Sequence, residues 1–438
     1  MSKKVSLLLK GAGEINPVSV SDYQKTGGYQ AIKNVMTMSD EQIINTLLDS
    51  KLLGRGGAAY PAGRKWQQLH GIKENPKYIV CNGDEGEPGT FKDRELLRLT
   101  PHRVIEGMLI AGYYFKAKRG IIYIRGEYRG IRNIFNEAIK NAEEAGLLGE
   151  NILGKKGFDY SITVVSGAGA YVCGENSALL NSIEAKVSRP RIKPPHLAEV
   201  GLYNMPTLVN NVETLACVPI IFSEDNQNFK NCGYKSDGGT KLISLSGHVK
   251  NRGIFETCHG ITLRDIIFDD ELGGGITEGK NFKFCHLGGQ SGPLAFPEQL
   301  EIKYCFDDLK EQGLAIGSGA VVVLDEDVCI LEYCIKVMEF FVYESCGKCT
   351  PCRLGTTRVL ELLKKMTSGN GQDGDIETLE LLIKNVTKLS ACGLGQSACK
   401  ALASGLKFRR KEFEDHIKGI CSTGTCSMNG GGQIRCHT

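Results

Sequence analysis

The sequence lacks several features that would define other classes of protein. It has no apolar run of about 18 residues, the length that a transmembrane helix needs. The N-terminal segment MSKKVSLLLKGAGE has a basic start, but its apolar run is too short for the core of a signal peptide. The net charge is only +3, and no basic stripe indicates a nucleic-acid-binding face. We therefore expect a cytoplasmic protein with no membrane span and no nucleic-acid partner.

Glycine and cysteine are the residue types present in excess. The 438 residues include 54 glycines and 17 cysteines, and the length suggests two to four domains. In a reducing compartment, closely spaced cysteines are more often metal ligands than a disulfide framework. The single, scattered cysteines are instead expected to be buried or reduced thiols; they are Cys217, Cys232, Cys258, Cys285, Cys305, Cys329 and Cys334.

The order of apolar segments predicts an α/β fold followed by other domains. Short apolar strands at 77–83, 120–128 and 160–167 alternate with helical patterns, which is typical of a mostly parallel sheet. Ligands of such sheets bind at the loops beyond the strand carboxyl ends. Residues 240–323 are rich in β pattern, and from residue 328 apolar residues recur three and four apart, which predicts helices.

The strongest chemical signal is the segment ESCGKCTPCR, 344–353. Cys346, Cys349 and Cys352 are spaced C-x2-C-x2-C, so that three thiolates from one tight loop can bind one iron–sulfur cluster. Cys392, in SACGLGQ, is the candidate for the fourth ligand because it follows a helical hairpin that can fold back. Four thiolates also suit zinc, but zinc motifs usually consist of two separated pairs.

Two glycine-rich loops suggest a phosphate-bearing, planar ligand. GRGGAA, 54–59, fits the dinucleotide fingerprint by letter, but a helix precedes it, so we reject a Rossmann site. The adjacent cations Arg55, Arg64 and Lys65 suit a phosphate or a planar ring. The acidic loop 81–96 can bind a hard metal, accept hydrogen bonds from a ribityl chain, ribose or carboxamide, or be a solvated loop. Adjacent amides in NNVET, 210–214, can pair with the edge of a flavin ring.

These motifs occur in an order that resembles a known family. GRGGAAYPAGRKW, CNGDEGEPGTFKDREL, YIRGEY, GAGAYVCGEN, RIKPPH, TLVNNVETLA, SGHVKN, GSGAVVV, ESCGKCTPCR and SACGLG follow one another between about residues 20 and 405. The chain closely resembles the flavin-bearing, NADH-oxidising subunit of respiratory complex I. It is also similar to the β subunits of NAD-linked or electron-bifurcating hydrogenases, formate dehydrogenases and transhydrogenases.

The resemblance implies four regions. Residues 1–235 would form an FMN-binding α/β domain with a mostly parallel sheet, and residues 236–325 a ubiquitin-like β-grasp domain. Residues 326–410 would form a helical-bundle domain that carries a [4Fe–4S] cluster, and residues 411–438 a cysteine-rich tail.

The resemblance also implies ligands, residue by residue. The residues expected to hold FMN are Gly54, Arg55, Gly56, Lys65, Asn82, Asp84, Tyr171, Gly174, Glu175, Val209, Asn210, Asn211 and Thr214. The residues expected to contact the nicotinamide nucleotide are Gly57, Ala58, Tyr60, Glu87 and Lys193. Cys346, Cys349, Cys352 and Cys392 match the cluster ligands. Glu175 is the candidate catalytic residue, with the role of orienting groups on the flavin side.

The implied activity is an NAD(P)H:acceptor oxidoreductase inside a soluble complex. NADH would deliver a hydride to FMN, and single electrons would pass to the cluster. Implied partners are a small [2Fe–2S] subunit with a thioredoxin fold, a larger catalytic subunit of hydrogenase, formate dehydrogenase or transhydrogenase type, and ferredoxin. Electron bifurcation is compatible with this class, but this chain alone does not encode it.

Three positions depart from the family pattern at the nucleotide end of the site. Asn176 stands where a second glutamate is common, and His196 and Gln68 replace aromatic residues. We favour NAD(H) as the nucleotide. These changes leave NADP(H) as an alternative. The alternative function is a structural or electron-relay subunit that has lost nucleotide binding.

The tail is a further departure. Cys421-x4-Cys426, with Cys436 and either His416 or His437, offers ligands for zinc or a small iron–sulfur site. The alternative is a flexible tail with free thiols.

Overall fold

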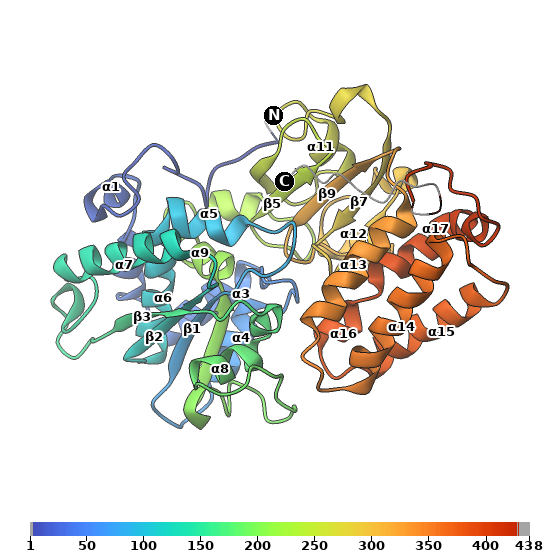
Figure 1. Ribbon diagram of the computed structural model, residues 1–438. Helices are drawn as coiled ribbons and strands as arrows, with labels where there is room; N and C mark the ends of the chain where they lie inside the picture. Colours follow the sequence, from blue (N-terminus) through green and yellow to red (C-terminus); the bar gives the residue numbers. More distant parts are fainter. Residues whose placement is uncertain (1–2, 427, 429–438) are drawn as a thin grey trace.

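The computed structural model describes residues 3–426 and residue 428, in three regions that follow one another along the chain. Figure 1 shows an α/β region, then a mixed sheet, then a group of helices, with the sheet region contacting both neighbours. Three large clusters of buried apolar residues follow these regions, although Leu242 of the second sheet belongs to the first cluster, and Phe284 and Leu324 belong to the cluster of the helices.

The α/β region is built on a parallel sheet. Its strands β1 (Tyr78–Gly83), β2 (Arg119–Ile124), β3 (Ser161–Ser166) and β4 (Thr207–Asn211) lie in the order β3-β2-β1-β4. All three pairings are parallel. Helices cover the sheet because a parallel sheet must bury both faces. The carboxyl ends of all four strands therefore meet at one edge, where the glycine-rich loops follow.

The helices of this region vary from one turn to four. α6 is buried almost throughout and packs so tightly on α9 that a Cβ at Gly107 would lie 2.1 Å from the Leu215 carbonyl oxygen. The helices are α1 (Val20–Lys25), α2 (Gln30–Val35), α3 (Asp40–Asp49), α4 (Ala62–His70), α5 (Lys92–Leu99), α6 (Pro101–Phe115), α7 (Arg129–Glu144), α8 (Asn176–Ile183), α9 (Val212–Ile221) and α10 (Asn226–Asn231).

The second sheet has the strand order of a ubiquitin-like β-grasp fold. Its strands β5 (Thr240–Gly247), β6 (Gly253–Cys258), β7 (Phe282–Leu287), β8 (Leu294–Ala295) and β9 (Ala320–Asp325) lie in the order β6-β5-β9-β7-β8. The central pair β5 and β9 is parallel, and the outer pairs are antiparallel. Helices α11 (Leu263–Phe268) and α12 (Phe306–Glu311) accompany this sheet.

Helices make up the last region. They are α13 (Ile330–Glu344), α14 (Thr350–Thr367), α15 (Asp375–Leu389), α16 (Gly393–Ser397) and α17 (Lys400–Ile417). Fully buried side chains such as Met338, Val359 and Leu379 form its core. The predicted fold class, with an α/β domain, a β-grasp domain and a helical bundle, is confirmed.

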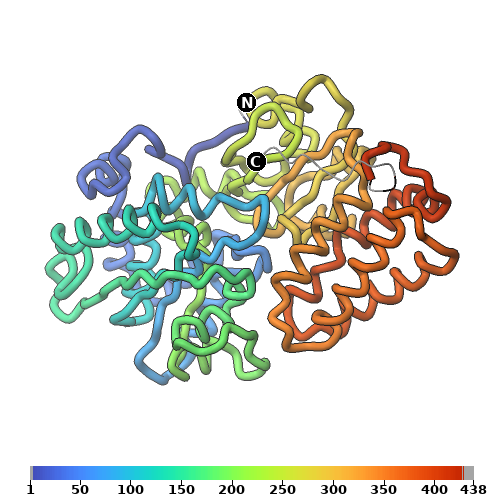
Figure 2. The backbone as a smooth tube through the Cα atoms, in the orientation of Figure 1, coloured from blue at the N-terminus to red at the C-terminus, as the bar shows by residue number. Residues whose placement is uncertain are grey.

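The N-terminal segment lies beside the second sheet. The backbone N–H groups of Leu7, Leu8 and Leu9 donate to the buried carboxylate of Glu256, over 2.9, 2.9 and 3.1 Å. Figure 2 shows this segment returning from the β-grasp region to the α/β region.

One pair of the scattered cysteines is joined in the fold. Cys232 is buried, as one form of the expectation for the scattered cysteines has it, but it forms a disulfide with Cys258, so neither residue is a reduced thiol. Their spacing of 26 residues gave no signal for a pair that only the fold brings together.

In the described part of the chain, no helix combines the length and the apolar character needed to cross a membrane.

Candidate functional site

The glycine loop that follows α3 lies against the carboxyl edge of the parallel sheet. The Arg55 N–H donates to the Thr214 hydroxyl over 2.8 Å, and the Trp66 indole N–H donates to the Asn210 side chain over 3.2 Å. The Lys65 ammonium donates to the Val209 carbonyl. These contacts bring the predicted residues of the loop and of the 209–214 segment together.

Two glycines of this loop are needed for its shape. A Cβ at Gly56 would lie 3.1 Å from the Asn211 Cβ, so the loop backbone contacts that side chain directly. Gly57 has a φ of +115°, which L-residues with a side chain rarely adopt. The loop therefore exposes backbone rather than side chains, as close approach of a planar ring requires.

The loop after β1 presents a buried carboxylate without a partner. Within the described chain, Asp84 Oδ2 has no hydrogen-bond partner. Burial raises the pKa of Asp84 to about 7, although Arg125 opposes the shift. Such an acceptor suits the hydroxyl groups of a ribityl chain. Asn82 is held beside it, because its side chain donates to the Gly174 carbonyl over 2.9 Å.

Two other carboxylates of this loop, Glu85 and Asp93, are used by the fold. Glu85 accepts from the N–H groups of Asp93 and Arg94, which begin α5, over 2.9 and 3.0 Å. Asp93 accepts from the Lys92 ammonium and from the Asn211 amide, each over 2.7 Å. These contacts favour a ligand-facing role for Asp84 and leave little support for the hard-metal interpretation.

Arg55 does not point its side chain toward the loop surface. Its guanidinium is fully buried, and Nη2 donates to the Gly238 carbonyl over 2.5 Å. Within the described chain its Nε and Nη1 have no hydrogen-bond partner. A direct contact of Arg55 with FMN therefore falls to its backbone.

Lys65, in the first turn of α4, is a half-buried cation that follows the glycine loop. Burial lowers the pKa of Lys65 to about 8, and the charge of Lys193 lowers it further. An anion at this point would stabilise the charged ammonium. The donor set therefore fits the phosphate of FMN.

Glu175 is the N-cap of α8. Its Oε2 accepts from the N–H groups of Ser177 and Ala178, each over 2.9 Å, and its Oε1 faces the Lys193 ammonium at 3.2 Å. Both carboxylate oxygens thus have partners. Next to it, the Asn176 side chain accepts from Asn82 over 3.1 Å, so the position that commonly carries a second glutamate is neutral.

Glu87, which is expected to contact the nucleotide, is a second, half-buried carboxylate of the loop after β1. It accepts from the Tyr171 hydroxyl over 2.6 Å and from the Ser291 N–H over 2.7 Å. Burial raises the pKa of Glu87, and these hydrogen bonds oppose the shift. Tyr60 remains 45% exposed and accepts from the Gln68 amide over 2.8 Å, so it is accessible to a ligand.

Loops of the β-grasp domain also border the site, although the sequence analysis assigned no ligand-binding role to any residue in them. A Cβ at Gly289 would lie 2.1 Å from the Glu87 Cγ, and one at Gly57 would lie 3.8 Å from the Gly317 carbonyl carbon. The Ser318 and Thr90 hydroxyls are hydrogen-bonded over 2.5 Å. The glycine-rich segments 288–292 and 317–319 were the signal that these loops approach another part of the chain closely.

The four predicted cluster ligands converge at one end of the helical bundle. Cys346, Cys349 and Cys352 lie between α13 and the first turn of α14, and Cys392 directly precedes α16. All four are free thiols, and the Ala391 N–H donates to the Cys349 sulfur over 3.5 Å. Burial raises the pKa of Cys392, and the nearby Cys346 and Cys349 raise it further. Four mutually close sulfurs fit a cuboidal cluster.

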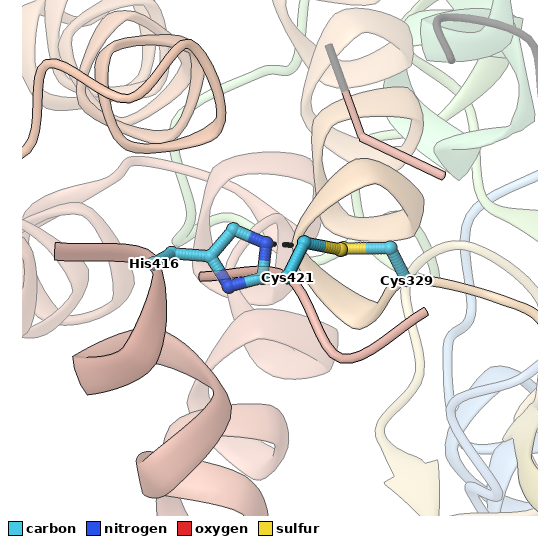
Figure 3. A group of neighbouring side chains, drawn as sticks. All are labelled: Cys329, His416 and Cys421. Atoms are coloured by element: carbon cyan, nitrogen blue, oxygen red, sulfur yellow. Dashed lines mark hydrogen bonds between the residues drawn. The ribbon is translucent and has the colours of Figure 1, made fainter. Parts of the chain in front are cut away.

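A second group of donors lies where the bundle ends. The ligand atoms of Cys329, His416 and Cys421 all lie within 4.8 Å of one another (Figure 3). His416 Nδ1 is 2.6 Å from the Glu412 carbonyl, and its Nε2 is 3.4 Å from the Cys329 sulfur. Cys426 is buried, and its thiol is hydrogen-bonded to that of Cys421.

This group revises the ligand set expected for the tail. His416, Cys421 and Cys426 were predicted, whereas Cys329 was expected to be an isolated thiol. That expectation was incomplete, because Cys329 precedes α13 and only the folded bundle brings it to the end of α17. Cys436 and His437 lie outside the described residues.

The fold, the loops at the carboxyl edge of the parallel sheet and the group of four cysteines define a flavin and iron–sulfur oxidoreductase of the NADH dehydrogenase type. Family comparison agrees: the Nuo51 FMN-binding domain matches residues 47–220, and the NADH-ubiquinone oxidoreductase-F iron-sulfur binding region matches residues 332–416. The chain belongs to the family of NADH-quinone oxidoreductase F subunits. The predicted family, enzyme class and cofactors FMN and [4Fe–4S] are therefore confirmed.

Individual relatives cover most of the chain. The F 2 subunit of NADH-quinone oxidoreductase from Rhizobium meliloti (strain 1021) is 42% identical over 400 residues, which are 91% of this chain and 94% of the relative. The HndC subunit of NADP-reducing hydrogenase from Solidesulfovibrio fructosivorans is 40% identical over 95% of this chain and 84% of its own length. A crystal structure of NAD+-reducing [NiFe]-hydrogenase in the H2-reduced state superposes with a TM-score of 0.82 at 30% identity, covering 94% of this chain and 67% of that chain.

Proposed function

We propose that the loops at the carboxyl edge of the parallel sheet hold FMN and NADH side by side, close to a [4Fe–4S] cluster on Cys346, Cys349, Cys352 and Cys392. When bound, FMN accepts a hydride from the nicotinamide and exchanges single electrons with the cluster. The observation that carries the proposal is the unpartnered carboxylate of Asp84 beside a backbone-lined glycine loop, with four free thiols at the facing end of the bundle.

The chain's own groups divide the work of binding. Lys65 would neutralise the phosphate, and Asp84 would accept hydrogen bonds from the ribityl hydroxyls. The amides of Asn210 and Asn211 would pair with the ring edge. Glu175 would act on the flavin side through Lys193, whose ammonium it holds at 3.2 Å. Glu87 and Tyr60 would position the nucleotide.

The test is anaerobic reduction of the FMN- and iron-loaded chain by NADH and, separately, by NADPH. Flavin bleaching and the EPR signal of the cluster are followed together. Fast bleaching by NADH with later cluster reduction supports the proposal. If neither nucleotide bleaches a bound flavin, also in the presence of the partner subunits, the chain is a relay and the proposal fails.

The same experiment decides nucleotide specificity. We favour NAD(H), although the neutral Asn176 places no carboxylate where it would repel the extra phosphate of NADPH. An Asn176→Glu variant restores the charge. We expect it to lower the kcat/KM for NADPH more than that for NADH.

We also propose that the chain works inside a multisubunit complex. Its named relatives include a quinone oxidoreductase subunit and a hydrogenase subunit. Partners of the expected kinds are a small [2Fe–2S] thioredoxin-fold subunit, a larger catalytic subunit and ferredoxin, in the cytoplasm. Affinity purification of the tagged chain from its host, with identification of the copurifying subunits, tests both the complex and its partners.

A second site is proposed at the end of the bundle, where Cys329, His416, Cys421 and Cys426 would bind one zinc ion. Three thiols and one imidazole form a usual structural zinc set. The contact between His416 Nδ1 and the Glu412 carbonyl leaves Nε2 free to bind a metal.

Metal analysis of purified variants tests this second site. Wild-type protein should contain about one zinc per chain, in addition to the iron of the cluster. Cys329→Ser and Cys421→Ser should lose the zinc but retain the iron. The matched control is Cys285→Ser, since Cys285 is equally buried but lies on β7 away from this group. Zinc content unchanged in Cys329→Ser would contradict the site.

A further inference from the structure

The cluster loop contacts the α/β domain through two side chains. Glu344, the last residue of α13, accepts a hydrogen bond from the Tyr171 backbone N–H over 2.9 Å. The Lys348 ammonium donates to the Pro190 carbonyl over 2.6 Å. Glu344 lies two positions before Cys346, and Lys348 lies between Cys346 and Cys349. Both contacts therefore originate in the segment that carries three cluster ligands.

The two contact points on the α/β domain belong to the loops of the flavin and nucleotide site. Tyr171 lies in the loop between β3 and α8 and is itself one of the residues expected to hold FMN. Pro190 lies three positions before Lys193, which is expected to contact the nucleotide. Each contact thus joins the cluster loop to one side of the same site.

Tyr171 is the centre of a larger junction. Its hydroxyl donates to Glu87 over 2.6 Å, and its ring packs edge-on against Phe340 with centroids 5.0 Å apart. Glu87 in turn accepts from the Ser291 N–H of the β-grasp domain over 2.7 Å. Hydrogen bonds that meet at Tyr171 and Glu87 therefore connect all three domains.

The position of Glu344 has no favourable explanation within its own helix. A carboxylate in the last helical turn faces the negative end of the helix dipole, which is unfavourable. The adjacent Tyr343 is 84% exposed, so the end of α13 is not otherwise buried. The hydrogen bond to Tyr171 supplies the interaction that the helix does not.

We propose that Glu344 and Lys348 are positioning residues. They fix the cluster loop against the two loops of the flavin site, and so set the separation and orientation across which electrons pass. The inference rests on the proposed function for the identity of that site, but the contacts themselves are tested separately.

The variants separate hydrogen bonding from charge. Glu344→Ala removes the acceptor, whereas Glu344→Gln retains an acceptor oxygen and removes only the charge. Lys348→Met breaks the second contact. The matched control is Glu339→Ala, because Glu339 is on the same helix and forms exposed ion pairs with Lys336 and Lys364 at 3.1 and 2.8 Å. FMN and iron contents are measured for every variant.

The kinetic readout is anaerobic stopped-flow absorbance combined with freeze-quench EPR of the loaded chain. Glu344→Ala should slow reduction of the cluster about tenfold, the effect of one lost hydrogen bond, while NADH bleaches the flavin at the wild-type rate. Lys348→Met should act in the same direction. Glu344→Gln and Glu339→Ala should behave as wild type.

The second readout does not depend on activity. Hydrogen–deuterium exchange should show faster exchange of the Tyr171 amide in Glu344→Ala than in wild type, with Glu344→Gln near wild type. Wild-type rates of cluster reduction in Glu344→Ala would overturn the proposal. Equal slowing in Glu344→Gln and Glu344→Ala would overturn it too, because the charge rather than the hydrogen bond would then matter. If NADH fails to bleach the wild-type flavin, the proposed function fails instead, and unchanged Tyr171 exchange in Glu344→Ala still refutes the contact.

Discussion

Lys65 illustrates how one buried side chain makes cofactor binding depend on pH. In the ligand-free chain its pKa is about 8, against an ordinary value of 10.5. The folded pKa lies below the unfolded one, so burial of this ammonium costs stability below pH 8, and that cost disappears as the pH rises toward 10.5. A bound phosphate reverses the shift, because it stabilises the charged form.

At a pH above about 8, FMN binding should therefore take up a proton, and its affinity should fall as the pH rises further. Isothermal titration calorimetry in two buffers with different heats of ionisation measures the proton uptake directly. Lys65→Arg, which stays charged throughout this range, should bind FMN without proton uptake. Proton uptake that persists in Lys65→Arg would assign the titration to another group.

Glu213 organises the charges beneath the site. It is fully buried and accepts from Lys241 at 2.6 Å and from Lys92 at 3.0 Å. Burial alone would raise the pKa of Glu213, but the surrounding cations hold it well below its usual range. The carboxylate therefore remains charged and balances two lysines that have no access to water.

Glu213→Gln leaves Lys241 without its counter-charge and Lys92 with Asp93 alone, and should lower the free energy of unfolding by about 3 to 5 kcal/mol. Urea denaturation followed by circular dichroism measures the loss. The comparison variant is Glu95→Gln, whose exposed pair with Arg98 should contribute less than about 1 kcal/mol. Similar losses in the two variants would show that burial of the network adds nothing.

At the scale of elements, the site depends on loops that approach one another closely because glycine has no side chain at the point of contact. Gly289 has a φ of +85°, and a Cβ there would lie 2.1 Å from the Glu87 Cγ. Gly279 has a similar φ of +68°, but no described atom lies within 4 Å of the place that a Cβ would occupy there. An alanine at either position would have the same unfavourable backbone conformation, but only an alanine at Gly289 would also clash with another residue.

Gly279→Ala should cost about 1 to 2 kcal/mol from the left-handed backbone alone. Gly289→Ala should cost more and also weaken NADH binding, since Glu87 must move. Differential scanning calorimetry and the KM for NADH check the two effects. A wild-type KM for NADH in a folded Gly289→Ala protein would show that Glu87 does not contribute to nucleotide binding.

The sequence predicted the elements better than the contacts between them. Alternating strands and helices predicted the parallel sheet and the edge at which its ligands bind, because both follow from local patterns. The C-x2-C-x2-C spacing predicted three cluster ligands for the same reason. Cys329, Ser291 and Glu344 were missed, since each acquires its partner from a distant part of the chain and no local pattern records that distance. The Cys232–Cys258 disulfide was missed on the same ground.

At the scale of the whole molecule, the domains have separate cores. One apolar cluster comprises residues between Leu8 and Leu242, and another comprises residues between Phe284 and Cys426. Of the expected iron–sulfur ligands, Cys352 belongs to the second core, and Cys349 and Cys392 pack against it. Loss of the [4Fe–4S] cluster should therefore destabilise the helical bundle before the other domains.

Removal of iron with a chelator under anaerobic conditions should increase hydrogen exchange in 345–397 while strands β1 to β4 keep their protection. Mass spectrometry of exchanged peptides resolves the two regions. Uniform loss of protection throughout the chain would show that the cores unfold as one unit.

The approach of Gly57 to Gly317 has a consequence for biosynthesis. The glycine loop leaves the ribosome early, whereas the β-grasp loops that border it are made much later, and domains fold in the order of their synthesis. The α/β domain must therefore fold with one wall of its pocket missing. We therefore expect flavin capture to be a late step that follows docking of the β-grasp domain, so that a chain stalled before residue 317 would form its parallel sheet without retaining the cofactor.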